Sequence, residues 1–282
     1  GTRATLTFTL PAPGTFNVVY TDGTTNFSAN GISNGATVSV SPTANTTYTI
    51  VSVTDVATTC SVTAPNPNIT GNAIVTVNPL PTASISGTTT ICSGNSVTLT
   101  FTLPAPGTFN VVYTDGTTNF NANGINNGAT VSVSPTANTT YTIVSVTDVA
   151  TTCSVTAPSP SITGSAVVTV NPLPTASISG TATICTGGTT ALTFTLPSPG
   201  TFDVVYTDGT TNFNANGISN GATVNVSPTA TITYTIVSVT NTTTTCAVSA
   251  PSPNITGSAV ITVSPLPVAN ISGTASICAG AP

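Results

Sequence analysis

The sequence has no Glu, Lys, His, Met or Trp, and charged residues make up only 2% of its 282 residues, against about 25% in an average soluble protein. Arg3 is the single basic residue, and the acidic residues are all aspartates. General acid–base catalysis needs side chains that titrate near the working pH, and a nucleophilic hydroxyl needs a neighbouring base. We therefore expect that the protein is not an enzyme and that it holds no cofactor.

The lack of basic residues and of long apolar runs also bears on partners. No basic patch is available for the phosphates of nucleic acid or for anionic lipid, and no apolar run approaches the roughly 20 residues of a membrane-spanning helix. We expect no nucleic-acid binding and no membrane insertion. Six cysteines without histidine or CxxC spacing do not fit a zinc site. They indicate an oxidising compartment, and hence an extracellular or cell-surface location.

Low charge does not indicate disorder in this chain. Hydrophobic residues make up 39% of the sequence, the mean hydropathy is +0.37 and the net charge is −5, whereas disordered chains combine low hydrophobicity with high net charge. Val, Ile, Thr, Phe and Tyr are plentiful, and these residues favour strands. The composition predicts an all-β protein.

An internal repeat of 93 residues organises the chain. The segment YTDGTTNF begins at Tyr20, Tyr113 and Tyr206, with no insertion or deletion between copies. The cysteines keep the same step in two series: Cys60, Cys153 and Cys246 form one, and Cys92, Cys185 and Cys278 form the other. This length is close to the roughly 100 residues of an immunoglobulin-like sandwich.

Within one repeat, short segments alternate apolar and polar residues, which is typical of half-buried antiparallel strands. They span 83–92, 97–103, 108–114, 129–134, 140–146 and 166–170. Asp115-Gly116 is a hairpin signal between two of them. The pattern predicts tandem immunoglobulin-like antiparallel β-sandwiches in a linear array.

Proline-rich linkers give the boundaries of these domains. NPLPTA occurs at 78–83 and 171–176, and SPLPVA occurs at 264–269; their prolines stiffen each junction and remove ladder donors. We predict three immunoglobulin-like repeats and a surplus first strand, over residues 1–80, 81–173, 174–266 and 267–282. On this division, repeat 1 lacks its own first strand.

The surplus strand allows two interpretations. The chain is either a window of a longer continuous array, or a discrete subunit whose segment 267–282 completes the first repeat of the next subunit. The second interpretation is donor-strand complementation, in which a strand from one chain fills a sheet of another.

The disulfide connectivity does not follow from the sequence. The pairing that we favour lies within repeats, Cys92–Cys153 and Cys185–Cys246, which leaves Cys60 and Cys278 as candidates for a bond between subunits. A linker-spanning set such as Cys60–Cys92 is an alternative. So is a bond between repeats such as Cys92–Cys246, because the turns after the first and sixth strands of a standard sandwich lie at opposite ends.

The recurring aspartates do not predict a metal site. Only Asp22, Asp115 and Asp208 recur in all repeats, each in a TDG turn. Hard cations usually need several carboxylates, so we predict no metal site.

Phe27 and its equivalents Phe120 and Phe213 are the candidates for stacking on a surface glycan, although packing in the core is the interpretation that we favour.

Three stretches carry a resemblance to a known family: PLPTASISGTTTICSGNSVTLTF at 79–101, VSVSPTANTTYTIVSVTD at 131–148 and VVTVNPLP at 167–174. They resemble the immunoglobulin-like or PKD-like repeats of very large surface adhesins exported by the type IX secretion system, including gliding-motility adhesins. Those repeats often have Gly-Cys in the late turn, where this chain has Thr-Thr-Cys. The resemblance implies Gram-negative export, a cell-surface or extracellular location, and an adhesive or filament role.

From these features we expect an extracellular structural repeat protein that forms a filament or stalk, with stability additive along the array. Its expected partner is another copy bound end to end, or the continuation of a longer chain. The alternative is a cell-surface adhesin whose repeats bind glycan or another cell surface.

Overall fold

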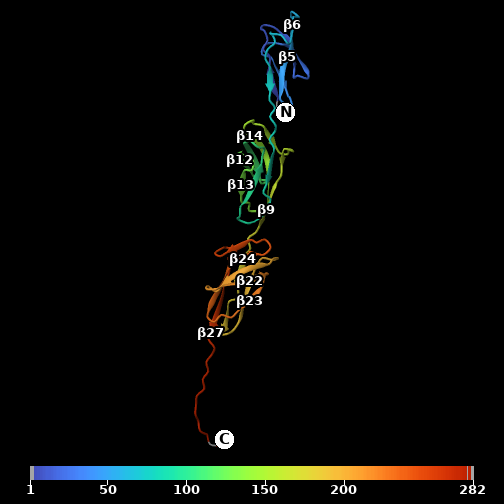
Figure 1. Cartoon of the computed structure of the whole chain (residues 1–282). Coiled ribbons are helices and arrows are strands. Elements are labelled where there is room, and N and C mark those ends of the chain that lie inside the picture. Colours follow the sequence, from blue (N-terminus) through green and yellow to red (C-terminus); the bar gives the residue numbers. More distant parts are fainter. Residues whose placement is uncertain (1–2, 278, 281–282) are drawn as a thin grey trace. The chain divides into compact units, whose positions relative to one another are not determined.

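The computed structural model describes residues 3–277 and 279–280, and within these residues it consists of strands and turns without a helix (Figure 1). This part of the chain accordingly has no helix long and apolar enough to cross a membrane. Three β-sandwich units follow one another in the sequence, which confirms the predicted fold class. We call them sandwich 1, sandwich 2 and sandwich 3, in chain order.

Sandwich 3 has two complete sheets. The first sheet has the order β23 (Thr223–Val226), β20 (Thr190–Thr195), β18 (Ala176–Ser179), β26 (Ile255–Thr256). The second has the order β19 (Ala182–Cys185), β27 (Ala259–Ser264), β24 (Ile232–Asn241), β21 (Phe202–Thr207), β22 (Asn212–Ile218), and β25 (Ala247–Ser249) also pairs with β24. The first strand of the sandwich therefore divides into β18 and β19, one half in each sheet.

The two halves of that first strand close both sheets. β18 runs antiparallel to β20 and parallel to β26, and β19 runs parallel to β27. Gly180 lies between the halves with a φ of 126°, a conformation that glycine adopts far more readily than other residues. This glycine allows the strand to pass from one sheet to the other.

Sandwich 2 repeats this arrangement. Its first sheet has the order β13 (Thr130–Val133), β10 (Val97–Thr102), β8 (Ala83–Ser86), β16 (Ile162–Thr163). Its second has the order β12 (Asn119–Ile125), β11 (Phe109–Thr114), β14 (Thr139–Asp148), β17 (Ala166–Asn171), β9 (Thr89–Cys92), with β15 (Ser154–Thr156) paired to β14. The divided first strand is thus present again, as β8 and β9.

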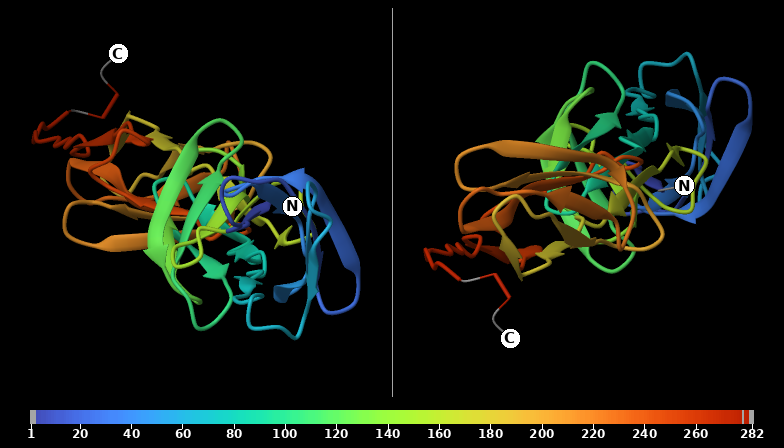
Figure 2. Two further views of the ribbon diagram at one scale, coloured as in Figure 1. Left: turned by 90° about the horizontal axis from the view of Figure 1, so that it is seen from above. Right: turned by 90° about the horizontal axis from the view of Figure 1, so that it is seen from below.

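Sandwich 1 has fewer strands. β1 (Ala4–Thr7) pairs with β4 (Thr37–Val40) alone, and the larger sheet contains β3 (Asn26–Ile32), β2 (Phe16–Thr21), β5 (Thr46–Asp55) and β6 (Ser61–Thr63), with β7 (Ala73–Val75) also on β5. At the other end of the chain, the described residues after β27 form no strand (Figures 1 and 2). The domain boundaries that the linkers indicate stay predictions.

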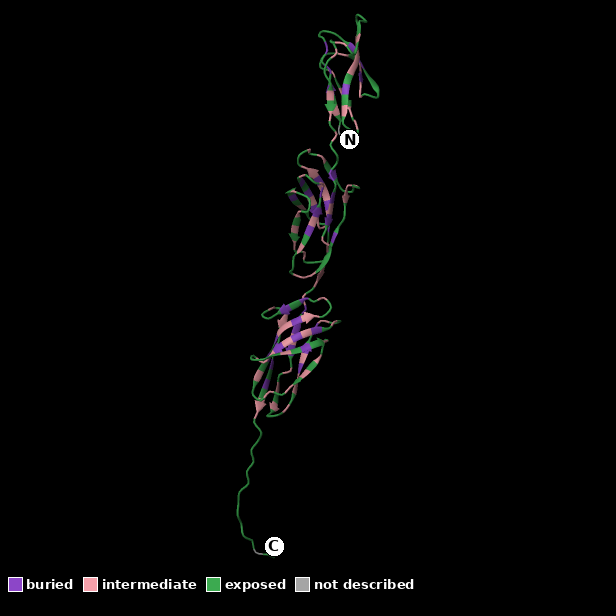
Figure 3. Cartoon of the chain, in the orientation of Figure 1, coloured by how far each residue is buried: buried purple, intermediate pink, exposed green. Residues whose placement is uncertain are grey.

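Each core follows from the two-residue period of its strands. In β21, Phe202, Val204 and Tyr206 are buried, while Asp203 and Val205 between them are only partly covered. Successive side chains of a strand point to opposite faces, so one face of each sheet carries the apolar residues. Figure 3 shows this alternation of buried and less buried residues along the strands.

The recurring aspartates organise hairpin turns. The carboxylate of Asp208 accepts hydrogen bonds from the backbone N–H of Thr211 (2.7 Å) and of Thr210 (2.9 Å), and from the Thr210 hydroxyl (2.8 Å). These bonds, led by that from the Thr211 N–H, lower the pKa of Asp208 below its ordinary value. Asp22 and Asp115 make the same bonds with the same effect on their pKa values.

This effect on the pKa predicts the acid sensitivity of the fold. A carboxylate with a lowered pKa in the folded state stabilises the fold above its unfolded pKa, and that contribution is lost as the pH falls through the folded pKa. We expect the melting temperature to fall as the pH is lowered below the ordinary aspartate value of 3.8. The variant with Asp22→Ala, Asp115→Ala and Asp208→Ala should melt at a lower temperature at neutral pH and lose less on acidification. Scanning calorimetry across the pH series measures both, and an unchanged acid slope would contradict the assignment.

Candidate functional site

The distinctive feature of sandwich 1 is the missing first strand. The strands that would pair with it are shorter than their equivalents, although their sequences are nearly the same: β1 has four residues where β10 has six, and β7 has three where β17 has six. The counterpart of β16, at residues 69–70, is not a strand. The loss of pairing partners explains all three differences, because these are the strands that contact β8 and β9 in sandwich 2.

The missing strand also leaves part of the core uncovered. Four side chains that are almost completely buried in sandwich 3 have only half-buried equivalents in sandwich 1. The buried residues are Ile236, Val239, Ala259 and Ile261, and their equivalents are Ile50, Val53, Ala73 and Val75. In sandwich 3, the buried cluster that contains them also includes Ala176 and Ile178 of β18.

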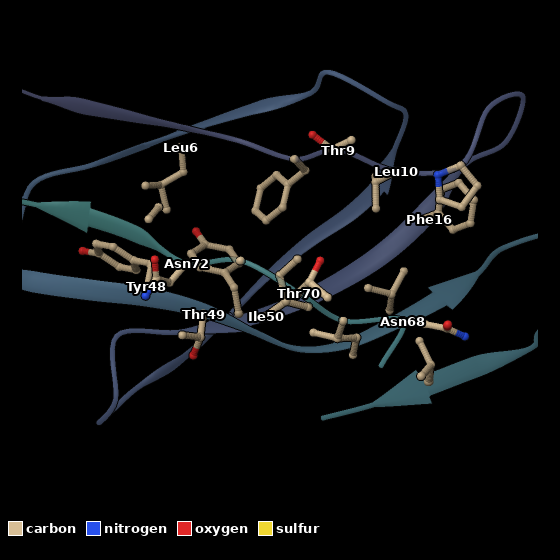
Figure 4. Close-up of a pocket in the computed structure, with 18 of the residues that line it drawn as sticks. Leu6, Thr9, Leu10, Phe16, Tyr48, Thr49, Ile50, Asn68, Thr70 and Asn72 are labelled. Atoms are coloured by element: carbon tan, nitrogen blue, oxygen red, sulfur yellow. The ribbon is translucent and has the colours of Figure 1, made fainter. Parts of the chain in front are cut away.

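A groove of about 890 Å³ lies along this uncovered core (Figure 4). Its apolar lining includes Leu6, Phe8, Leu10, Tyr48, Ile50 and Ala73. The segment from Asn68 to Asn72 lines it as well, and in sandwich 2 the matching residues 161–165 contain β16. The groove therefore combines an apolar floor with unpaired strand backbone, which is the arrangement that accepts an added strand. We call it the acceptor groove.

A glycine marks where the absent strand would approach most closely. A Cβ added to Gly164 would lie 2.7 Å from the carbonyl oxygen of Ile85 in β8, a distance that does not occur between these atoms. Gly257 faces Ile178 of β18 in the same way. The equivalent Gly71 has nothing within 4 Å of such a Cβ. Sandwich 1 therefore has no strand that lies against Gly71 as β8 lies against Gly164.

The C-terminal segment has the sequence of the missing strand. Residues 265–277 are exposed and form no strand (Figure 3). Val268, Ile271 and Ile277 are 95%, 97% and 91% exposed. Two repeats earlier, Ala83 and Ile85 stand at the positions of Ala269 and Ile271, and these two side chains are buried in sandwich 2. We call residues 267–277 the donor segment.

The donor segment keeps the glycine that the divided strand needs. A Cβ added to Gly180 would lie 2.5 Å from the carbonyl oxygen of Ala191, and one added to Gly87 would lie 2.7 Å from that of Thr98. Gly273 is the third member of this series and meets nothing within 4 Å. No contact of the exposed donor segment therefore requires a glycine at this position. A docked first strand would require one, because Gly87 and Gly180 each lie against a carbonyl oxygen of the neighbouring strand.

The disulfide connectivity corrects the pairing that we favoured from the sequence. Cys92, the last residue of β9, is bonded to Cys246, with 5.6 Å between their Cα atoms. The predicted bonds Cys92–Cys153 and Cys185–Cys246 are therefore wrong, and the alternative between repeats is the one found. Cys60, Cys153 and Cys185 are free thiols, and Cys278 lies outside the described residues.

The strand registers explain why a bond within one sandwich cannot form. Cys185 lies opposite Ser264, three residues beyond Ile261, which lies opposite the first residue of β24. Cys246 lies at the other end of the same strand, where its carbonyl accepts a hydrogen bond from the N–H of Asn241, the last residue of β24 (2.9 Å). The ten residues of β24 extend about 30 Å at roughly 3.3 Å per residue, whereas the Cα atoms of a disulfide are about 4.4–6.8 Å apart.

The aromatic side chains considered for glycan binding are used in packing. Phe213 stacks on Tyr206 with 5.3 Å between ring centroids and lies 6.5 Å from the ring of Tyr234. Phe27 and Phe120 stack in the same way in sandwiches 1 and 2. These contacts favour the role in packing that we predicted. Over residues 3–277 and 279–280, no cluster of three or more His, Cys, Asp or Glu side chains could hold a metal ion.

No protein-family model and no curated protein matches the sequence. The similar proteins are all solved structures, and each has low sequence identity. A chimeric titin Z1Z2-Z1Z2 tandem carrying a GRGDS peptide from fibronectin is 13% identical, with a TM-score of 0.24 over 64% of this chain and 96% of its own. A marsupial T cell receptor is 12% identical, with a TM-score of 0.38 over 84% and 92%. A Corynebacterium diphtheriae protein described as membrane anchored is 13% identical, with a TM-score of 0.27 over 95% and 87%. With TM-scores below 0.5, none of these likenesses carries an argument about this chain.

The acceptor groove should be visible in hydrogen exchange. In a chain ending at Leu266, we expect the amides of Thr7, Thr9 and Ile74 to exchange faster than their equivalents in sandwich 3, because those equivalents face the first strand and the pairing partner is missing in sandwich 1. A synthetic peptide of residues 267–280 with Cys278→Ser should slow them. The same peptide with Ile271→Asp is the control and should not. Mass spectrometry of peptic fragments reads this out, and equal exchange in both sandwiches without peptide would show that sandwich 1 is already closed.

Proposed function

We propose that this protein is an extracellular structural subunit that polymerises by donor-strand complementation. The donor segment of one copy enters the acceptor groove of sandwich 1 in the next copy and forms the first strand of that sandwich. One observation carries the proposal: sandwich 1 lacks the strand that completes sandwiches 2 and 3, while the same sequence stands exposed and unpaired after sandwich 3.

The contacts of β8 and β18 indicate how the docked segment would bind. Ala176 donates its backbone N–H to the carbonyl of Asn254 (2.8 Å), and Ala83 donates in the same way to Ser161 (2.8 Å). By the repeat, Ala269 would donate to Asn68 of the acceptor. The side chains of Ala269 and Ile271 would then cover Ile50, Val53, Ala73 and Val75. Fully burying one isoleucine contributes about 1.5–3 kcal/mol, in addition to the ladder hydrogen bonds.

Three features support an extracellular location and a structural role. The disulfide between Cys92 and Cys246 suits an oxidising compartment. The resemblance of residues 79–101 and 131–148 to repeats of type IX-secreted adhesins suits export to the cell surface. The sequence offers no histidine, lysine or glutamate for catalysis. We therefore propose a filament or stalk, and no observation on the aromatic residues favours the glycan-binding alternative.

Two substitutions in the donor segment test the polymer. Ile271→Asp should reduce donor binding at least about 100-fold, because the loss of isoleucine burial and the desolvation of a carboxylate together exceed about 3 kcal/mol. Val268→Asp is the matched control: its equivalents Thr82 and Thr175 are exposed, so polymers should still form. Both positions are more than nine-tenths exposed in the single chain, so neither substitution should change the folding of the subunit. Electron microscopy and light scattering of the full 282-residue chain measure assembly.

Several outcomes would reject the proposal. A monomer whose acceptor groove is protected against hydrogen exchange would mean that the donor segment folds back onto its own sandwich 1. Equal loss of polymer in Ile271→Asp and Val268→Asp would mean that the segment does not dock in the register of β18. Native material that keeps a mass far above 27.7 kDa after reduction would mean that a continuous chain fills the groove instead of a second copy.

A further inference from the structure

We propose that Cys185 of one copy forms a disulfide with Cys60 of the next copy, so that the polymer is covalently linked at each junction between subunits. This inference rests on the donor-strand contact proposed above. It differs from the bond between Cys60 and Cys278 that was the simplest expectation from the sequence, and it follows from the connectivity that the structure shows.

The register of the observed bond determines the partners. Cys92 is the first-strand cysteine of sandwich 2, and Cys246 is the late-turn cysteine of sandwich 3. The bond therefore joins the first strand of one sandwich to the late turn of the sandwich that follows. At the next step along the array, the first-strand cysteine is Cys185, and the following sandwich is sandwich 1 of the next copy. The late-turn cysteine of that sandwich is Cys60.

The linker across the proposed junction matches the linker across the observed one. Between β17 and β18 the chain reads Asn-Pro-Leu-Pro-Thr-Ala over 171–176, and after β27 it reads Ser-Pro-Leu-Pro-Val-Ala over 264–269. The two segments have the same length and both prolines at the same positions. Docking of Ala269 at the position of Ala176 would therefore connect sandwich 3 to the next sandwich 1 through the spacing that brings Cys92 to Cys246.

The late turn of sandwich 1 already has the geometry of the bonded turn. Thr59, before Cys60, has a φ of 61°, and Thr245, before Cys246, has a φ of 59°; a β-branched residue rarely adopts this conformation. Asp55 donates its N–H to the carbonyl of Cys60 at 2.9 Å, as Asn241 does to that of Cys246. Formation of the bond would require no rearrangement of this turn.

The first-strand cysteine of sandwich 3 is prepared in the same way. The carbonyl of Cys185 accepts a hydrogen bond from the N–H of Gly188 (2.8 Å), and Thr186 donates to the carbonyl of Ser264 (2.9 Å). At Cys92 the corresponding bonds measure 3.0 and 2.8 Å. Cys60 and Cys185 differ from the bonded pair in their exposure: both are exposed thiols, whereas Cys246 is completely buried.

Bond formation is a two-electron oxidation. The thiols of Cys60 and Cys185 lose two protons and two electrons and form one S–S bond. The oxidant is a small-molecule disulfide: the thiolate of one cysteine displaces one of its halves, the second cysteine attacks the resulting mixed disulfide, and the oxidant leaves as two thiols. The same register assigns Cys278, which lies outside the described residues, to Cys153 of the next copy.

The test uses the full chain with Cys278→Ser, so that any covalent link between copies must come from other cysteines. Polymers are assembled with oxidised and reduced glutathione from equal amounts of ¹⁴N- and ¹⁵N-labelled chain and digested with chymotrypsin without reduction. We expect cross-linked peptides that contain Cys60 and Cys185 and join one light and one heavy chain in about half of the cases. Peptides that contain Cys92 and Cys246 should join chains of the same label.

A non-reducing gel gives an independent readout. The Cys278→Ser chain should form a ladder at multiples of 27.7 kDa, and adding Cys60→Ser or Cys185→Ser should leave one band while filaments still form. A chain in which both Cys92→Ser and Cys246→Ser are added to Cys278→Ser is the control and should keep its ladder.

The outcomes separate this inference from the donor-strand proposal. Filaments without a ladder, with Cys60 and Cys185 reduced, would overturn the disulfide and leave donor-strand assembly standing. A ladder whose peptides join other cysteines, or Cys60–Cys185 peptides of one label only, would overturn the register. Absence of filaments in every variant, including the unsubstituted chain, would overturn donor-strand assembly and this inference together.

Discussion

The first strand of each sandwich is the element on which both its fold and its neighbours depend. It contributes one half to each sheet, and its alanine and isoleucine side chains complete the core. Where it is absent, strand pairs shorten and Ile50 and Val53 remain half-buried. In the proposed polymer, completion of sandwich 1 and assembly would therefore be the same interaction, because the free energy released on docking would be stabilisation that sandwich 1 lacks on its own.

The scarcity of charge restricts what can hold such an assembly together. With one basic residue and six acidic ones, the chain has almost no means to form ion pairs between copies, and surface ion pairs contribute little in any case. The contacts that remain are the backbone ladder, the burial of apolar side chains and the disulfides. None of these is strongly weakened by salt, so the proposed polymer should hold together over a wide range of ionic strength.

The sequence was sufficient for the repeat and the all-β class, because a 93-residue period and alternating apolar residues appear directly in the residue order. It was not sufficient for the disulfide: a standard sandwich suggested opposite ends for the two cysteines of a repeat and left the bond between repeats open, but only the registers of β19, β27 and β24 rule out Cys185–Cys246. The role of Gly71 was equally hidden, since its positive φ of 83° alone accounts for a glycine. The close approach appears only when Gly164 is compared with the carbonyl of Ile85.

Nearly identical repeats raise the question of why a donor segment would not enter the wrong sandwich. The answer lies in covalent tethering. In sandwiches 2 and 3 the first strand precedes its own sandwich in the same chain, which gives it an effective concentration in the millimolar range. The donor segment of a separate subunit at micromolar concentration cannot compete with that tethered strand, although its side chains fit equally well. Among the described residues, no first strand directly precedes sandwich 1. In the proposed polymer, one sequence could therefore serve every junction and the direction of growth would still be defined.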